Sequence, residues 1–251
     1  MIIESLKDAI FSICILTFRK LIIMDRLFLV FQILTPVILT YFMGYSFGSY
    51  ISNINGIPYP IYLASGMIVF NAIFTSQWLG HGIWDERKNG MYTQLRVMGF
   101  SEYHYLVSSL LYNLIFALFS MIVILIAYPE LILKLSAISI PYILSAFTLL
   151  VAFYGSISMI ISLISKDQVT FVLINTAIFE ISAFTSSALY PPSHDISIVT
   201  ALNPLSYIVD IMRIALFGLD SEKIGIEMSI IIILGLCMIV LARKIISKTS
   251  E

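Results

Sequence analysis

Charged residues are scarce in this sequence. Only 12% of the 251 residues are Asp, Glu, Lys or Arg, whereas 59% are hydrophobic; a soluble domain carries about 25% charged residues. The composition therefore argues against a soluble fold and predicts a polytopic membrane protein. The net charge of -1 provides no basic excess for nucleic acid, so we expect membrane lipid and not nucleic acid as a partner.

The motifs of catalytic and metal sites are also missing. Cys14 and Cys237 have no CxxC or Cys/His spacing, and the three histidines form no HExxH pattern. The stretch GYSFG at 44–48 matches the hydrolase pattern GxSxG in letters, but it lies in an apolar run without the strand-to-helix context. No GxxxxGK(S/T) occurs, so the chain has no P-loop for ATP phosphates. We predict no catalytic residue, metal or cofactor in this chain, and any ATP-driven work requires a partner.

Long apolar runs predict an all-α membrane protein with six transmembrane helices. A hydrocarbon core of about 30 Å needs roughly 20 helical residues. The runs of this length are 27–48, 60–80, 105–128, 137–164, 169–190 and 225–242. Eleven of the fourteen Lys and Arg residues lie on the side of both termini, which predicts cytoplasmic termini. We interpret 1–251 as a single transmembrane domain, with no cleaved signal peptide.

The segment 1–26 has the pattern of an amphipathic helix. Its apolar positions are Ile2, Ile3, Leu6, Ala9, Ile10, Ile13 and Leu16, and its polar positions are Glu4, Lys7, Asp8 and Ser12. This spacing favours a helix that lies in the membrane interface. The alternative is a cytoplasmic extension of the first span.

The cytoplasmic segment 81–104 concentrates charge between two spans. Gly90 and Gly99 bracket the run MYTQLRVM, which is long enough for about two helical turns. We predict a short amphipathic helix at the cytoplasmic face.

The external segment 191–224 combines helix breakers with apolar residues. Asn203-Pro204 is typical of a helix start, and Gly218 suits a C-terminal cap. The residues between them are too few to cross a bilayer and too apolar for water, which predicts a re-entrant or interfacial helix. Asp210 and Arg213 are three apart and therefore able to pair on one helical face. The pair either takes part in gating or only anchors the helix at the headgroups.

Glu180 lies in the middle of the fifth apolar run. A carboxylate at this depth is costly and normally faces protein or a watery cavity. It is a candidate cation or proton site or a partner for Arg213; the alternative is a protonated packing residue.

Three features together resemble the membrane subunits of ABC-2 type transporters. Glu86 and Arg87, followed by Gly90 and Leu95, are similar to that family's ERxxGxxxxL segment after the second span. The stretches SSALYPP and ALNPLSYIVDIMR resemble its segment after the fifth span, with Asn203, Pro204, Asp210 and Arg213 at matching positions. An amphipathic N-terminal helix and six spans agree with its layout. Met91 and Gly99 depart from the small hydroxyl residue and the proline that the family often has.

The resemblance implies the function of an export permease. A separate ATP-binding-cassette ATPase would bind ATP and Mg²⁺, and Glu86, Arg87, Gly90 and Leu95 would belong to the helix that couples to it, with the charges making the contact. A second permease copy or paralogue would complete a path for a drug, lipid or glycan across the cell membrane, and the external segment would act as a lid.

Aromatic residues of the first and fifth runs either line this path or pack; they are Phe28, Phe31, Tyr41, Phe42, Phe171 and Phe179. The alternative function is an ion-coupled secondary transporter that uses Glu180.

Overall fold

The structure is a computed structural model that describes residues 2–23, 26–136, 139–191, 197–218 and 224–249. Within these ranges the side chains of 2–7, 23, 26–29, 31–33, 197 and 248–249 lie outside the description. The expectations for Phe28, Phe31 and the polar positions Glu4 and Lys7 therefore concern side chains outside the described part.

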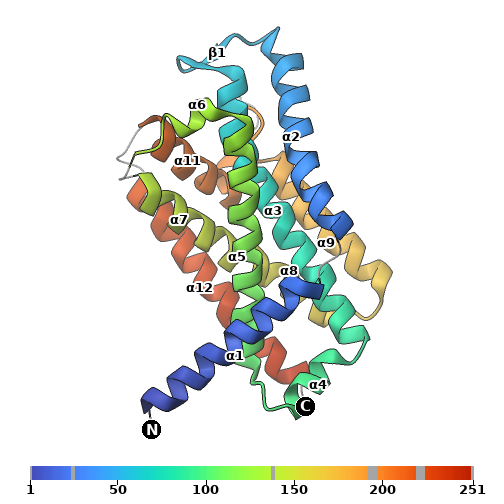
Figure 1. Cartoon of the computed structure of the whole chain (residues 1–251). Coiled ribbons are helices and arrows are strands. Elements are labelled where there is room, and N and C mark those ends of the chain that lie inside the picture. Colours follow the sequence, from blue (N-terminus) through green and yellow to red (C-terminus); the bar gives the residue numbers. More distant parts are fainter. Residues whose placement is uncertain (1, 24–25, 137–138, 192–196, 219–223, 250–251) are drawn as a thin grey trace.

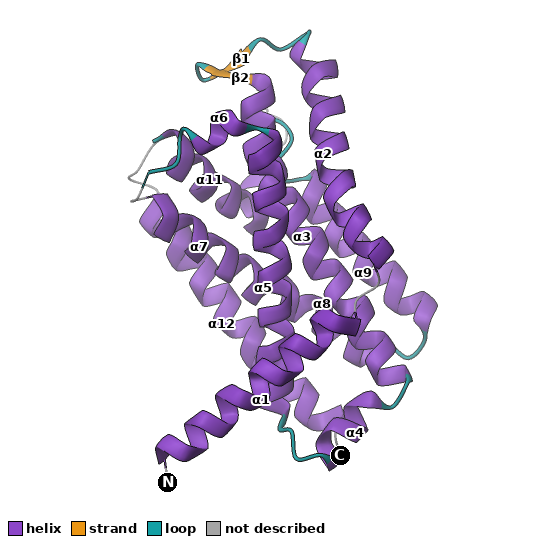
Figure 2. Ribbon diagram, in the orientation of Figure 1, coloured by secondary structure: helices purple, strands orange, loops and turns teal. Residues whose placement is uncertain are grey.

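The described chain is almost entirely helical, as predicted (Figure 2). Its elements are α1 (Ile2–Ile23), α2 (Arg26–Gly48), β1 (Asn53–Ile54), β2 (Ile57–Pro58), α3 (Tyr59–Lys88), α4 (Met91–Val97), α5 (Glu102–Ala127), α6 (Pro129–Ile132), α7 (Ser139–Leu150), the π-helical turn η1 (Val151–Gly155), α8 (Ser156–Ile164), α9 (Gln168–Phe184), α10 (Ser197–Leu202), α11 (Pro204–Phe217) and α12 (Ile224–Thr249). The two short strands form an antiparallel hairpin.

Four stretches of the described helices are long and apolar enough to cross a membrane: 59–88, 102–127, 139–164 and 224–247. The chain is therefore an all-α membrane protein. The helix α9 is apolar but has only 17 residues, and several side chains of α2 lie outside the description. The count of six spans stays a prediction.

The bundle is built around α3. This helix contacts α2, α5, α8, α9 and α11, and its residues from Tyr62 to Ile73 are nearly all buried, as expected for a helix that is apolar on every side. Figure 1 shows the start of α1, the end of α12 and the short α4 at one end of the bundle, with the hairpin, α6 and α11 toward the other. This arrangement agrees with the prediction that both termini share a side with the 81–104 segment.

Two predicted boundaries were wrong. The fifth run was expected to be helical to residue 190, but α9 ends at Phe184, because Ser186, Ala188 and Leu189 turn back into the bundle and are buried there. The segment from His81 was expected to be a loop, but α3 continues as a helix to Lys88. Residues 85–88 are mostly good helix formers, and the basic side chains in this last turn favour the negative end of the helix dipole.

The helix α1 lies obliquely against the lower end of the bundle (Figure 1). Leu16 and Thr17 are buried on α5, where the Thr17 hydroxyl donates to the carbonyl of Ser108. An apolar stripe on α1 stays exposed; it consists of Phe11, Ile15, Phe18 and Ile22. This stripe suits the predicted interfacial position, which stays a prediction.

Candidate functional site

Glu86 joins three helices at the lower end of the bundle. Its Oε2 lies 2.7 Å from Nζ of Lys20 in α1 and accepts a 2.6 Å hydrogen bond from the Tyr105 hydroxyl in α5. The side chains of Lys20 and Glu86 are only 10% and 14% exposed. Burial lowers the pKa of Lys20 and the charge of Glu86 raises it again, so the carboxylate is what keeps this lysine charged inside the protein.

Arg87 caps the neighbouring span. Its Nη1 donates hydrogen bonds of 3.0 Å to the carbonyls of Ser162 and Ser165 at the end of α8, and its guanidinium lies 5.6 Å from the Trp84 ring centroid. These carbonyls have no partner within their helix, so a cation here is favourable. Both side chains make bonds within the chain, and Arg87 is also exposed. The expectation that Glu86 and Arg87 contact a partner stays a prediction.

The short helix α4 lies where the glycine pair predicted it. Gly90 precedes it with a φ of 68° and Gly99 follows it with a φ of 89°, a backbone region that glycine adopts without steric cost. Leu95 is buried at 6% exposure in an apolar cluster with Leu16 and Ile83. The outer face of α4 is exposed, including Val97 and Met98 at 84% and 70%.

The helix α11 starts at Asn203 as predicted. The Asn203 side chain accepts a 2.9 Å hydrogen bond from the Leu205 amide, and Pro204 occupies the first turn. The same side chain donates from Nδ2 to the Ser182 carbonyl at 2.7 Å and to the Thr185 hydroxyl at 3.0 Å. Gly218 ends the helix with a φ of 68°. The cap therefore also ties α11 to the end of α9.

We expect Asn203→Ala to lower the free energy of unfolding by about 1–2 kcal/mol, because it removes the cap and the two bonds to α9. Asn203→Ser keeps a side-chain acceptor that suits a helix cap and loses the amide donor, without burying a charge beside the Ser182 carbonyl. Thermal melting of the purified protein in detergent should rank wild type above Asn203→Ser and Asn203→Ser above Asn203→Ala. Equal melting of all three would show that the cap contributes nothing.

Arg213 faces protein. It is 5% exposed, its guanidinium lies 3.7 Å from the Tyr62 ring centroid, and its Nη2 donates to the Ala188 carbonyl at 3.2 Å. A stacked arginine in a low-dielectric setting gains both cation–π and hydrogen-bond energy. The Asp210 carboxylate accepts a long 3.5 Å bond from the Ser187 hydroxyl. The pairing of Asp210 with Arg213 stays a prediction, as does a role in gating.

Glu180 is partly exposed and makes no hydrogen bond or ion pair with any residue of the described part. Of the aromatic residues considered for the path, Phe171 and Phe179 are completely buried and pack, whereas Tyr41 and Phe42 are 55% and 71% exposed.

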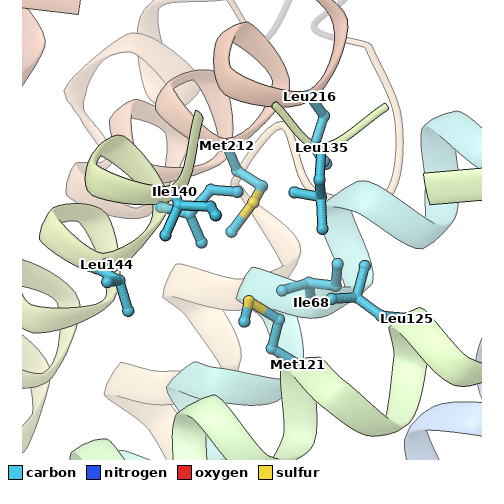
Figure 3. A pocket seen from close by; sticks show the side chains of 9 residues that line it. Ile68, Met121, Leu125, Leu135, Ile140, Leu144, Met212 and Leu216 are labelled. Carbon is cyan, nitrogen blue, oxygen red and sulfur yellow. The ribbon is translucent and has the colours of Figure 1, made fainter. Parts of the chain in front are cut away.

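A small cavity lies between α3, α5, α7 and α11 (Figure 3). Its volume is about 70 Å³, and Ile68, Met121, Met212 and five other labelled hydrophobic side chains surround it in the figure. Because its walls are apolar, it has room for hydrocarbon and no group to hold a polar headgroup.

The partners of the predicted residues were missed. Lys20, Tyr105 and Tyr62 were not singled out, since nothing near them in the sequence pairs them with Glu86 or Arg213. A buried cation needs a partner, and this rule predicts that partners exist without saying which residues they are.

The family model described as ABC-2 family transporter protein matches residues 52–244. The search of curated proteins finds no match to this chain. The matched range contains all of α3, α4, α9 and α11. Lys20 and the path candidates Tyr41 and Phe42 precede it.

Proposed function

Because the chain belongs to the ABC-2 family of transporter proteins, we propose that it is the permease subunit of an ATP-driven exporter. It is a multi-pass membrane protein, and the family's membrane subunit has no catalytic activity of its own. The energy would come from a separate ATP-binding-cassette ATPase that holds ATP and Mg²⁺. The membrane would be the cell membrane, with both termini and α4 in the cytoplasm, where the excess of Lys and Arg favours them.

The observation that carries the proposal is the anchoring of α4. Leu95 fixes this helix in the cluster that also contains Leu16 of α1, while Val97 and Met98 project outward. A partner that pushes on the outer face would therefore move α4 together with the end of α3. Glu86 and Arg87 extend the connection to α1, α5 and α8 through partly buried hydrogen bonds. In this role they stiffen the coupling segment.

A second permease copy or paralogue would complete the path. Exposed apolar side chains cover the outer sides of α2 and α9, both of which pack on α3; they include Leu34, Ile38, Phe42, Leu173 and Ile181. The external helix α11, held by Asn203 and Arg213, would form the lid. An amphipathic substrate would then move between the two copies as the ATPases close on ATP.

The experiment is co-purification of the permease with the ATP-binding-cassette ATPase encoded nearest to it, followed by ATP hydrolysis in lipid nanodiscs. Leu95→Ala removes a buried anchor worth about 2–5 kcal/mol, so we expect loss of ATPase association or of permease-stimulated hydrolysis. Leu133→Ala is the matched control, because Leu133 is 85% exposed at the other end of the bundle. Absence of any associated ATPase with wild type would refute the permease assignment, and equal hydrolysis by both variants would refute the role of α4.

A further inference from the structure

Two contacts fix how α9 lies along α3. Near the middle of the seam the Gln77 side chain donates to the Thr176 hydroxyl at 3.2 Å. Farther toward the outer end, the rings of Phe70 and Phe184 meet edge to face with centroids 5.8 Å apart. The two helices are thus antiparallel, and Glu180 is four residues from both Thr176 and Phe184. Residues four apart share a helix face, so Glu180 lies on the face of α9 that borders α3, between these two contacts.

Aromatic rings line the α3 side of this seam. Phe70, Phe74 and Trp78 recur every four residues, and the rings of Phe70 and Phe74 are 5.0 Å apart. Phe70 is buried, Phe74 is half-buried and Trp78 is 51% exposed. Phe184 on the opposite helix is 50% exposed. The antiparallel register places Glu180 at the level of Phe74, with the half-exposed ring of Phe184 one turn away on α9. The Trp78 ring packs against His81, with centroids 5.1 Å apart.

Lys and Arg are absent from this seam, and its basic residue is His81, whose ring lies 5.1 Å from that of Trp78 and 4.9 Å from that of Phe171. Neither α9 nor the stretch of α3 from Tyr59 to Trp84 contains a Lys or Arg, and α2 has none after Arg26. Glu180 makes no ion pair with the described residues, and an unpaired carboxylate at membrane depth is expensive. The polar bonds that Asn175 makes go to Gln77 and Ser158 on the buried side. The Glu180 carboxylate is therefore available to a ligand that enters from outside the bundle.

We propose that the α3–α9 seam binds an amphipathic organic cation, such as a protonated amine or a quaternary ammonium or phosphonium with aromatic substituents. Glu180 pairs with the positive charge, and Phe74 and Phe184 offer ring faces to it and to its apolar groups. This inference rests on the proposed function, because it names the substrate class of the permease. The proposed occupant of the seam is a cation, and the competing occupants are a lipid chain and a second permease copy.

The chain's two tryptophans allow a direct test. Both Trp78 and Trp84 are on α3, so a Trp84→Phe background leaves Trp78 as the single fluorophore beside the seam. The probe is tetraphenylphosphonium, titrated into the purified permease in nanodiscs without ATPase. We expect a saturable change of Trp78 fluorescence, and an affinity about tenfold lower in Glu180→Gln, which loses the charge pair. Tetraphenylborate, which has the same shape and the opposite charge, should bind no better to wild type than to Glu180→Gln.

Matched variants separate the site from general effects. Phe74→Leu keeps apolar volume and loses a ring face, so its affinity should fall roughly threefold to tenfold, whereas Phe119→Leu on α5 and Glu130→Gln on α6 should leave binding unchanged. Each variant is first shown to elute as a single folded species. Absence of saturation, equal binding to Glu180→Gln, or equal preference for tetraphenylborate would overturn the proposal and leave the seam to lipid or to a second copy. Because no ATPase is present, these results are independent of the co-purification that tests the permease assignment.

Discussion

Replacing Gly66 by Ala is expected to lower the free energy of unfolding by about 3 kcal/mol or more and to abolish transport. A Cβ at Gly66 would lie 1.9 Å from the Ala188 carbonyl oxygen and 2.7 Å from its carbonyl carbon. These are backbone atoms, so no side chain is able to rotate away. The segment around Ala188 would have to move, and it would lose the bonds from Arg213 to Ala188 and from Tyr59 to Leu189.

Gly82→Ala is the control for this substitution. Gly82 is on the same helix, and a Cβ there meets nothing within 4 Å, so the better helix propensity of alanine should leave stability equal or raise it by up to about 1 kcal/mol. Thermal melting followed by size-exclusion chromatography in detergent compares the two variants. If Gly66→Ala melted with wild type, the close approach of α3 to the Ala188 segment would be wrong.

Features set by neighbouring residues could be predicted from the sequence. The external helix is an example, because Asn203, Pro204 and Gly218 are local start and stop signals that act through their own backbone. The helix between Gly90 and Gly99 was predicted for the same reason. In both cases the residues that decide the structure are within a few positions of one another.

Features set by distant residues could not be predicted. α9 ends early because residues after Phe184 find space beside Gly66, which is more than a hundred positions away along the chain. The π-helical turn at 151–155 lies where Gly155 packs on Asn113 and Leu110 of α5, and no sequence pattern marks it. Likewise, 66 positions separate Lys20 from Glu86, so no sequence pattern marked the ion pair that turns Glu86 into the bundle, whereas Asp85, Lys88 and Arg96 are exposed.

The pair Lys20–Glu86 leads to the second large expected effect. Glu86→Gln removes the carboxylate that keeps Lys20 charged, and Lys20→Met leaves Glu86 buried with only the Tyr105 hydroxyl. Breaking a buried ion pair from one side costs about 3–5 kcal/mol, so both single variants should melt well below wild type. The double variant leaves no buried charge of this pair and should be more stable than either single variant, which is the signature of direct coupling.

The pH dependence of thermal melting tests the Lys20–Glu86 pair independently. Burial already lowers the pKa of Lys20 below its ordinary 10.5, and without Glu86 the pKa falls further. At neutral pH, folding of Glu86→Gln buries a protonated Lys20 without a partner charge, which lowers the free energy of unfolding. This loss becomes smaller as the pH rises through the lowered pKa, because Lys20 is then neutral in the folded state. The melting difference between Glu86→Gln and wild type should shrink from about pH 7 to about pH 10, and the double variant should not show this recovery. A constant difference would mean that Glu86 acts through packing and not through the charge of Lys20.

The double variant then separates folding from coupling. If Lys20→Met with Glu86→Gln folds, binds the ATPase and still loses permease-stimulated ATP hydrolysis, the charged link between α1 and the end of α3 transmits the motion of α4 in addition to stabilising the fold. If hydrolysis is retained, the link is only structural, and Leu95 alone carries the movement into the bundle. The first outcome is expected, because Gln and Met replace a bond of 2.7 Å between charged groups with an uncharged contact between α1 and α3, which resists displacement far less.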